Sequence, residues 1–226
     1  MSLEGILFDF GGTLDSDGGH WLDRTFALYD RRGLNVPRPE IKQAFYAADE
    51  ACVQADRVRH PNMRELMAYH FEYQLQMLGI PSAADRDWLC DQFCLDAEAA
   101  FLRNVPTLEA LSRKYRLGIL SNFYGNLASV CESAGIARFF KAIVDSTREN
   151  LKKPDLGFFR LGLEKIGAAP GHAAMVGDNL DRDILPAKEL GMKTFWVMGE
   201  RGRMATRMGI ADHQVQRIGD LLSYLG

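Results

Sequence analysis

Gly5-Ile6-Leu7-Phe8-Asp9-Phe10-Gly11-Gly12-Thr13 is the stretch that decides the fold of this 226-residue chain. Its first part is an apolar run without polar alternation, which is typical of a strand buried on both faces of a parallel sheet. The run ends on an aspartate and two glycines, a turn in which backbone N–H groups can face an anion beside the carboxylate. We therefore expect a central strand that carries Asp9 as a nucleophile or metal ligand; an aspartate that merely caps the next turn is the alternative.

The same apolar pattern returns further along the chain, and helical stretches lie between the repeats. The expected strands cover residues 117–122, 142–145, 173–178 and 193–197, and the expected helices cover 107–114, 126–134, 156–166 and 184–190. This alternation predicts an α/β fold with a doubly wound parallel sheet. Ligands of such sheets bind beyond the carboxyl ends of the strands, where Asp9, Ser121, Asn122 and Asp178 would lie.

The alternation fails between Gly18 and Arg103, where aromatic and apolar residues recur at helical spacing. We expect a core domain of residues 1–17 and 104–226 and an inserted α-helical cap domain of residues 18–103, placed over the site as a lid. Prolines are expected to break the cap into several helices, at Pro37, Pro39, Pro61 and Pro81. The tail from Gly199 to Gly226 is expected to hold a helical piece and a final amphipathic turn.

Charge and composition exclude several classes of partner. The chain has 27 basic and 30 acidic residues, a net charge of -3, so no overall electrostatic case exists for a nucleic acid or an anionic membrane. The N-terminus lacks a signal-peptide pattern and no long apolar run is present, so we expect a cytoplasmic protein. Four cysteines without a CxxC pair are too few for a disulfide scaffold. The oligomeric state is not readable from these patterns.

Acidic residues crowd the stretch Val176-Gly177-Asp178-Asn179-Leu180-Asp181-Arg182-Asp183. Such a cluster costs electrostatic free energy unless a cation offsets it, and oxygen ligands with few histidines suit Mg²⁺ better than zinc. An acidic helix N-terminus, favoured by the helix dipole, is the alternative. It explains Asp181 better than it explains Asp178 at the end of a strand.

Two further positions point to an anion. In Lys152-Lys153-Pro154-Asp155 a helix begins, and a lysine there would neutralise both a carboxylate and a bound phosphate. Ser121 and Asn122 would donate hydrogen bonds to the same anion. A surface lysine and an ordinary turn before a helix are the alternatives.

Together these elements resemble the haloacid dehalogenase (HAD) superfamily, through nearly the whole chain. The matching motifs are Asp9-Phe10-Gly11-Gly12-Thr13-Leu14, Ser121, Lys153 with Pro154, and Gly177-Asp178 with Asp183. The helical insertion looks like the C1-type cap of subfamily I. The resemblance implies a Rossmann-like core and a hydrolase of a small phosphorylated metabolite, in which Asp9 attacks phosphorus to form an aspartyl-phosphate that water then hydrolyses.

The resemblance also implies roles for particular residues. It implies that Asp9, Gly11, Asp178 and Asp183 serve a Mg²⁺ cofactor, Gly11 through its backbone carbonyl and Asp183 by supporting the metal's surroundings. Ser121 and Lys153 would hold the phosphoryl oxygens and neutralise their charge. The substrate-binding candidates are Gly12, Thr13, Ser121, Asn122 and Lys153.

One position departs from the pattern of the family. Its phosphatases carry a general acid and base two residues after the nucleophile, where this chain has Gly11. General acid–base help is worth about a hundred- to ten-thousand-fold in rate, so hydrolysis would be slow unless another group moves the proton. Asp15 is the candidate replacement, with Asp17 and His20 as the other nearby groups, although an aspartate in such a loop is more often a turn former.

Gly11 also opens alternative functions. One is a HAD-fold protein that binds a phosphorylated ligand or a partner without turnover. A second is a dehalogenase, which needs no Mg²⁺ and lacks the metal-binding aspartate that Asp178 supplies here. A third is a phosphonatase, which keeps Mg²⁺ but needs a cap lysine to form a Schiff base. Lys42 is the only lysine of the insertion, and a solvated helix face explains it better.

Substrate recognition is expected to come from the cap, without a recognisable code. Its candidate side chains are His20, Trp21, Arg57, Arg59, His60, Arg64, Tyr69 and His70.

Overall fold

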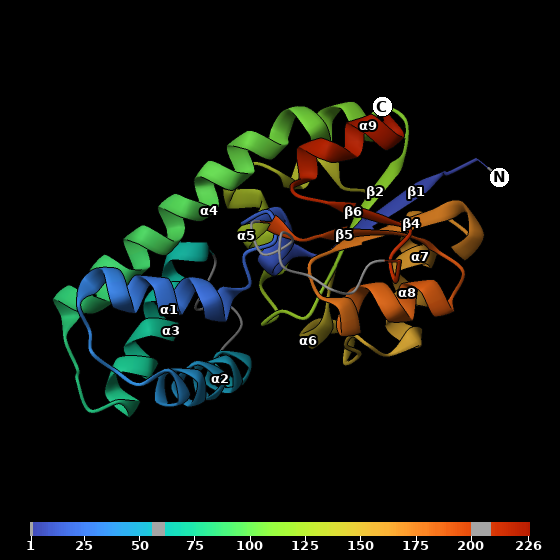
Figure 1. The fold of residues 1–226 in the computed structure, drawn as a ribbon. Coiled ribbons are helices and arrows are strands. Elements are labelled where there is room, and N and C mark those ends of the chain that lie inside the picture. The colour runs from blue at the N-terminus through green and yellow to red at the C-terminus, as the bar shows by residue number, and fades with distance from the viewer. Residues whose placement is uncertain (1, 56–61, 200–208) are drawn as a thin grey trace.

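A parallel sheet forms the centre of the molecule. The computed structural model describes residues 2–55, 62–199 and 209–226, and within them a 6-stranded sheet runs in the order β3-β2-β1-β4-β5-β6 with every pair parallel (Figure 1). The strands are β1 (Gly5–Phe8), β2 (Arg116–Ser121), β3 (Ala142–Asp145), β4 (Ala173–Gly177), β5 (Lys193–Val197) and β6 (His213–Val215). The predicted doubly wound α/β core is confirmed.

The central strand β1 is buried on both faces. Ile6 and Phe8 belong to the core on the side of α4 (Ala83–Ser112) and α9 (Leu222–Leu225). Leu7 points the other way and packs in a second core with α7 (Leu156–Ile166). Because side chains alternate between the two faces of a strand and both faces are covered here, the strand reads as a continuous apolar run.

Shorter helices complete the core layers, and two sequence predictions need correction. These helices are α5 (Leu127–Ser133), α6 (Ser146–Glu149) and α8 (Leu185–Glu189). The predicted helix at 107–114 is instead the last part of α4. The tail, expected to hold a helical piece and a final amphipathic turn, also contributes β6, which pairs with β5 at the edge of the sheet. A strand of 3 residues is too short to show a period of its own.

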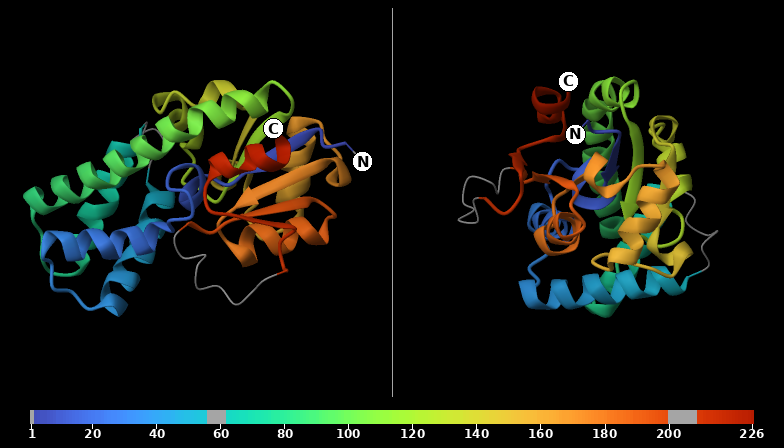
Figure 2. Two further views of the ribbon diagram at one scale, coloured as in Figure 1. Left: turned by 45° about the horizontal axis from the view of Figure 1, so that its top comes forward. Right: turned by 90° about the vertical axis from the view of Figure 1, so that its right-hand side faces the viewer.

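Four helices lie beyond one end of the sheet and make up the cap: α1 (Trp21–Arg32), α2 (Arg38–Gln54), α3 (Met63–Met77) and the part of α4 that packs on them. Figure 2 shows α4 running along the molecule from the cap to the sheet. This helix passes without a break through the predicted boundary at residues 103 and 104, and it also contains Pro106. The domain limits stay a prediction.

The prolines of the cap have different effects. Pro37 and Pro81 lie in breaks between helices, as predicted, whereas Pro39 lies in the first turn of α2. A first-turn proline is tolerated because its missing N–H would have no partner within the helix. Pro61 lies outside the described residues. No helix in the described parts of the chain is long and apolar enough to span a bilayer.

Glycines bring α7 close to the sheet. A Cβ atom on Gly118 would lie 2.6 Å from Cγ2 of Ile166 and 2.9 Å from Cδ2 of Leu7. The neighbouring strand repeats the arrangement, because a Cβ on Gly5 would lie 2.7 Å from Cδ1 of Ile166. The side chain of Ile166 therefore fills the space that these two strands leave without side chains.

Gly118→Ala is expected to lower the free energy of unfolding by about 2 kcal/mol, because Ile166 and Leu7 must move to admit a methyl group. Urea denaturation of both proteins measures the difference. Gly171→Ala is the matched control, since nothing lies within 4 Å of the added Cβ; its effect is expected to stay within about 0.5 kcal/mol. Equal stability of Gly118→Ala and the wild-type protein would contradict this account of the packing.

Candidate active site

A pocket lies where the carboxyl ends of β1, β2 and β4 meet the cap. From the core it is lined by Asp9, Gly11, Ser121, Lys153, Asp178 and Asp183, among others. Parallel strands bring these residues together although they are separated by up to 174 positions (Asp183 minus Asp9) in the chain. Residues from all four predicted motifs therefore line one pocket.

A buried ammonium group connects two of the acids. Nζ of Lys153 lies 2.6 Å from Oδ1 of Asp9 and 2.6 Å from Oδ1 of Asp183. Ser121 donates a hydrogen bond from Oγ to the same Asp9 oxygen at 2.9 Å. Each of these side chains is buried, and a buried charge is stable only with partners of this kind.

The burial of this group changes its titration. Burial alone would lower the pKa of Lys153, but the carboxylates of Asp183 and Asp9 raise it above its ordinary value, so the ammonium keeps its charge. Burial raises the pKa of Asp183 to about 6, although Lys153 acts against this shift. Lys153 thus offers a permanent positive charge beside the carboxylate of Asp9.

A third acid joins this pair and makes the site suitable for a metal ion. Asp9, Asp178 and Asp183 each offer a carboxylate oxygen, and these atoms lie within 4.8 Å of one another. Lys153 offsets only part of their negative charge. A cation that prefers carboxylate oxygens, as Mg²⁺ does, fits this set of ligands.

Gly12 allows Asp178 to lie close to the turn after β1. A Cβ on Gly12 would lie 2.6 Å from Oδ2 of Asp178, and the φ of Gly12 is 91°, in the region that favours glycine. Thr13 donates from its hydroxyl to Oδ1 of Asp178 at 3.3 Å. Neither Gly12 nor Thr13 lines the pocket, so their part in substrate binding stays a prediction.

Asn122 lines the pocket and also positions Lys153. Its Nδ2 donates to the carbonyl of Lys153 at 3.0 Å, and its Oδ1 accepts from the N–H of Lys153 at 2.8 Å. Both polar atoms of the Asn122 amide therefore hold the backbone of Lys153. Asn122 therefore positions Lys153, and its binding of substrate stays a prediction.

Asp15 lies away from the reacting groups. Its side chain is fully buried and outside the pocket, and it accepts hydrogen bonds from Nε1 of Trp21 at 2.6 Å and the N–H of Gly12 at 2.7 Å. It also forms an ion pair with Arg24 at 2.7 Å. Burial raises the pKa of Asp15, although Arg24 acts against this shift. We therefore leave Asp15 out of the catalytic set proposed below.

The other two groups considered near Gly11 have different surroundings. Asp17 pairs with Arg103 at 3.1 Å and accepts from the N–H of Ile218, outside the pocket. His20 lines the pocket, and its Nδ1 accepts the N–H of Leu22 at 3.2 Å where α1 begins. This bond places the proton of the neutral imidazole on Nε2.

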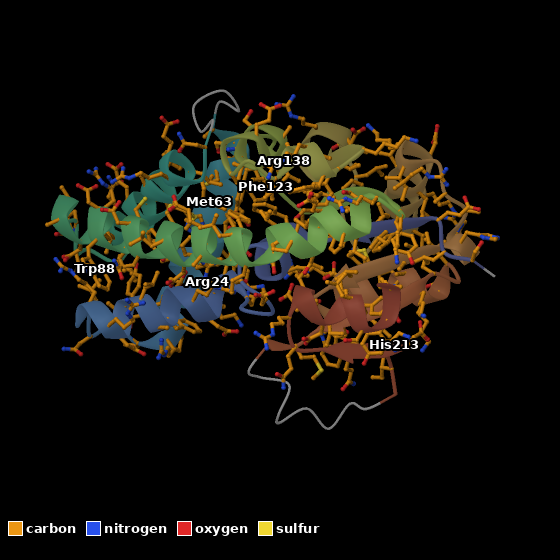
Figure 3. All side chains as sticks on the ribbon, turned by 90° about the horizontal axis from the view of Figure 1, so that it is seen from above. Arg24, Met63, Trp88, Phe123, Arg138 and His213 are labelled. Atoms are coloured by element: carbon orange, nitrogen blue, oxygen red, sulfur yellow. The ribbon has the colours of Figure 1, made fainter. Side chains whose placement is uncertain are left out.

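Trp21 occupies the space beside Gly11. A Cβ on Gly11 would lie 3.2 Å from Nε1 and 3.3 Å from Cε2 of Trp21. The indole is held by its bond to Asp15 and by Phe123, whose ring centroid is 6.0 Å away. Figure 3 labels Phe123 between the cap helices and the sheet, and Arg24 on α1. The place of the usual acid is therefore next to a fixed aromatic ring.

Sequence reasoning missed several residues that line the pocket. They are Phe45, Tyr46, Asp49, Phe123, Tyr124, Asn179 and Arg182. No local signal marks them, because each lies within an ordinary helix or follows a motif. Of the cap candidates, His20 and Trp21 line the pocket, whereas Arg57, Arg59 and His60 lie outside the described residues. Arg64, Tyr69 and His70 do not line it.

Known proteins resemble this chain in sequence. The family model for haloacid dehalogenase-like hydrolases matches residues 3–191. A glyceraldehyde 3-phosphate phosphatase of Pyrococcus abyssi is 33% identical over 138 residues, 57% of this chain and 56% of the relative. A phosphoserine phosphatase of Thermus thermophilus is 37% identical over 90 residues, 39% of this chain and 36% of the relative. The match therefore spans 56% of the first relative's length and 36% of the second's.

Solved structures of a phosphatase and of a dehalogenase share the fold of this chain. A HAD phosphatase from Thermococcus onnurineus has a TM-score of 0.58 at 22% identity, covering 99% of this chain and 98% of the other. The L-2-haloacid dehalogenase of Xanthobacter autotrophicus has a TM-score of 0.59 at 18% identity, covering 99% and 100%. At these identities the likeness concerns the fold alone.

Asp15→Asn is expected to lower the free energy of unfolding by about 3 kcal/mol, because the guanidinium of Arg24, whose side chain is only 12% exposed, loses its counter-charge. Urea denaturation measures the loss. Asp30→Asn is the control: Asp30 pairs with Arg38 at the surface, where the exposed fractions are 61% and 49%, and its loss is expected to cost less than about 1 kcal/mol. The account fails if the two variants are equally stable.

Proposed function

Since the chain belongs to the haloacid dehalogenase-like hydrolases, we propose that it is a Mg²⁺-dependent phosphatase of a small phosphorylated metabolite that works through an aspartyl-phosphate. The observation that carries this proposal is the buried contact of Lys153 with Asp9 beside a second and a third carboxylate. A nucleophilic carboxylate, a fixed cation and a metal-binding acid set are the groups that phosphoryl transfer needs. The phosphatase names of the relatives support the same reaction.

Each residue of the pocket has a separate role in the proposed reaction. Oδ2 of Asp9 attacks phosphorus, since Oδ1 is held by Lys153 and Ser121. The bond from phosphorus to the ester oxygen breaks, the alcohol leaves with a proton from water, and a second water molecule cleaves the aspartyl-phosphate to release phosphate. Lys153 and Ser121 then neutralise and bind the phosphoryl oxygens. Asp9, Asp178 and the Gly11 carbonyl would hold Mg²⁺, with Asp183 beside them. When bound, the ion neutralises charge on the phosphoryl group and orients it.

Gly11 favours a second candidate, a protein that binds a phosphorylated ligand with little or no turnover. No carboxyl group stands two residues after Asp9, and Trp21 lies where its side chain would project. The retained acid set, by contrast, disfavours a metal-independent dehalogenase. The cytoplasmic location remains a prediction.

Asp9→Asn is expected to reduce phosphate release from p-nitrophenyl phosphate and metabolite phosphates by a thousandfold or more, because the amide is a poor nucleophile. Assays with and without Mg²⁺ make the measurement, and removal of the ion with EDTA is expected to abolish release. Asp181→Asn is the control, since Asp181 is an exposed acid of the same segment outside the pocket. Unchanged turnover in Asp9→Asn would disprove the proposed nucleophile.

Gly11→Asp is expected to raise turnover by less than about tenfold, well below the hundred- to ten-thousand-fold typical of general acid–base catalysis, because the new side chain meets Trp21. Steady-state rates of Gly11→Asp and Gly11→Asn separate the two effects, since the amide has the same size and no acid. A gain above a hundredfold in Gly11→Asp alone would show that Trp21 does not restrict this position.

A further inference from the structure

Asp49 of α2 brings a carboxylate from the cap into the pocket that also contains Asp9. The exposed fraction of its side chain is 29%. The aspartyl-phosphate reaction described above does not use this group. Its contacts and surroundings indicate what it binds.

The Asp49 carboxylate is held by two donors from different parts of the chain. Tyr124, in the loop after β2, donates its hydroxyl to Oδ1 of Asp49. Burial raises the pKa of Tyr124 well above its ordinary value, so the hydroxyl keeps its proton. Its loop is itself held, because Oδ2 of Asp145 accepts from the N–H groups of Gly125 at 2.8 Å and Leu127 at 3.1 Å.

The second donor is His70, which is fully buried behind Asp49. Tyr29 donates to Oε1 of Gln74 at 3.2 Å, so the Gln74 amide turns its Nε2 towards Nδ1 of His70 at 2.7 Å. Nδ1 therefore accepts, and the proton of the neutral ring lies on Nε2. Nε2 lies 3.1 Å from Oδ1 of Asp49 and donates to it.

Both of these contacts use the same oxygen of Asp49. Within the described residues, the hydrogen bonds that Asp49 accepts fall on Oδ1, which leaves Oδ2 for a ligand. An ionised carboxylate accepts hydrogen bonds and donates none. The group that Oδ2 meets in the pocket must therefore be a donor.

Aromatic residues line the same pocket as this carboxylate, and one of them, Tyr124, contacts it directly. Phe45 and Tyr46 come from α2, which also carries Asp49. Trp21 and Tyr124 line the pocket as well, and the centroids of these two rings are 6.2 Å apart. The cations that line the pocket in the described chain, Lys153 and Arg182, come from the core. A carboxylate among aromatic faces is the environment that binds an organic ammonium group, through charge and cation–π attraction.

We propose that Asp49 binds a protonated amine on the leaving group, so that the substrates are phosphate monoesters of amino alcohols. This inference rests on the proposed function, because the phosphoryl group must lie at Asp9 and Lys153. The core end of the pocket then receives the negative part of the substrate, and the cap end receives the positive part.

The test compares 2-aminoethyl phosphate with propyl phosphate, in which a methyl group replaces the ammonium. The wild-type full-length chain with Mg²⁺ is expected to prefer the amine by about 10- to 100-fold in kcat/KM, the range of a hydrogen bond to a charged group. Asp49→Asn keeps the shape and the accepting oxygen, and is expected to bring this ratio to about 1. The loss is expected in KM rather than in kcat, because Asp49 does not touch the reacting atoms.

Asp96→Asn is the matched control, since Asp96 is an exposed cap carboxylate, 57% exposed, outside the pocket; its ratio is expected to equal that of the wild-type protein. Equal ratios in the wild type and Asp49→Asn overturn the proposal. If the wild-type protein prefers 2-hydroxyethyl phosphate to 2-aminoethyl phosphate, the assignment of an ammonium group to Asp49 is overturned.

The preference for the amine can also be measured as binding affinity, without turnover. Isothermal titration calorimetry of the Asp9→Asn chain, with and without Asp49→Asn, gives the dissociation constants of the two esters. If the wild-type chain hydrolyses neither ester but the Asp9→Asn chain binds 2-aminoethyl phosphate through Asp49, the ammonium contact is supported and hydrolysis of amino-alcohol phosphates is overturned. Equal dissociation constants for the two esters overturn the inference whatever the turnover.

Discussion

The buried contact of Lys153 with Asp9 and Asp183 is the interaction on which the site depends. It joins the end of β1, the segment after α6 and the turn after β4, three parts of the chain that are distant in sequence. A buried ammonium without partners would cost several kcal/mol. These three segments can therefore adopt only an arrangement in which both carboxylates reach the same nitrogen atom.

Neighbouring residues serve this arrangement. Asn122 holds the backbone of Lys153 with both atoms of its amide, and so ties the end of β2 to the same group. Gly177 lies so close to the Asp183 carboxylate that a Cβ atom would overlap it. The hydrogen bonds to Lys153 and the absence of a Cβ atom at Gly177 thus both allow the acids to lie close together. Asp9, Asp178 and Asp183 carry more negative charge than Lys153 offsets. This surplus of negative charge favours the binding of a cation at the site.

The cap is joined to the core by polar contacts of its own. Asp15, in the turn after β1, pairs with Arg24 of α1, and Tyr124, after β2, donates to Asp49 of α2. The first two cap helices are therefore each held to a loop at the carboxyl edge of the sheet. Among the described residues, the core supplies the acids around Asp9 together with Lys153 and Arg182, and the cap helices supply aromatic rings and the carboxylate of Asp49. The core side and the cap side of the pocket therefore carry different chemical groups, because each is built from a different part of the chain.

The sequence by itself determined the five longer strands, their parallel sheet and the positions of the motif residues at strand ends. Each of these depends on apolar runs and turn residues that are local in the chain. Only the tertiary structure decided that α4 continues into the core, that Asp15 is paired inside the protein, and that Asp49 lines the same pocket as Asp9. A local pattern reports how far a segment is buried, whereas the partner of a polar side chain depends on which distant segments pack against it.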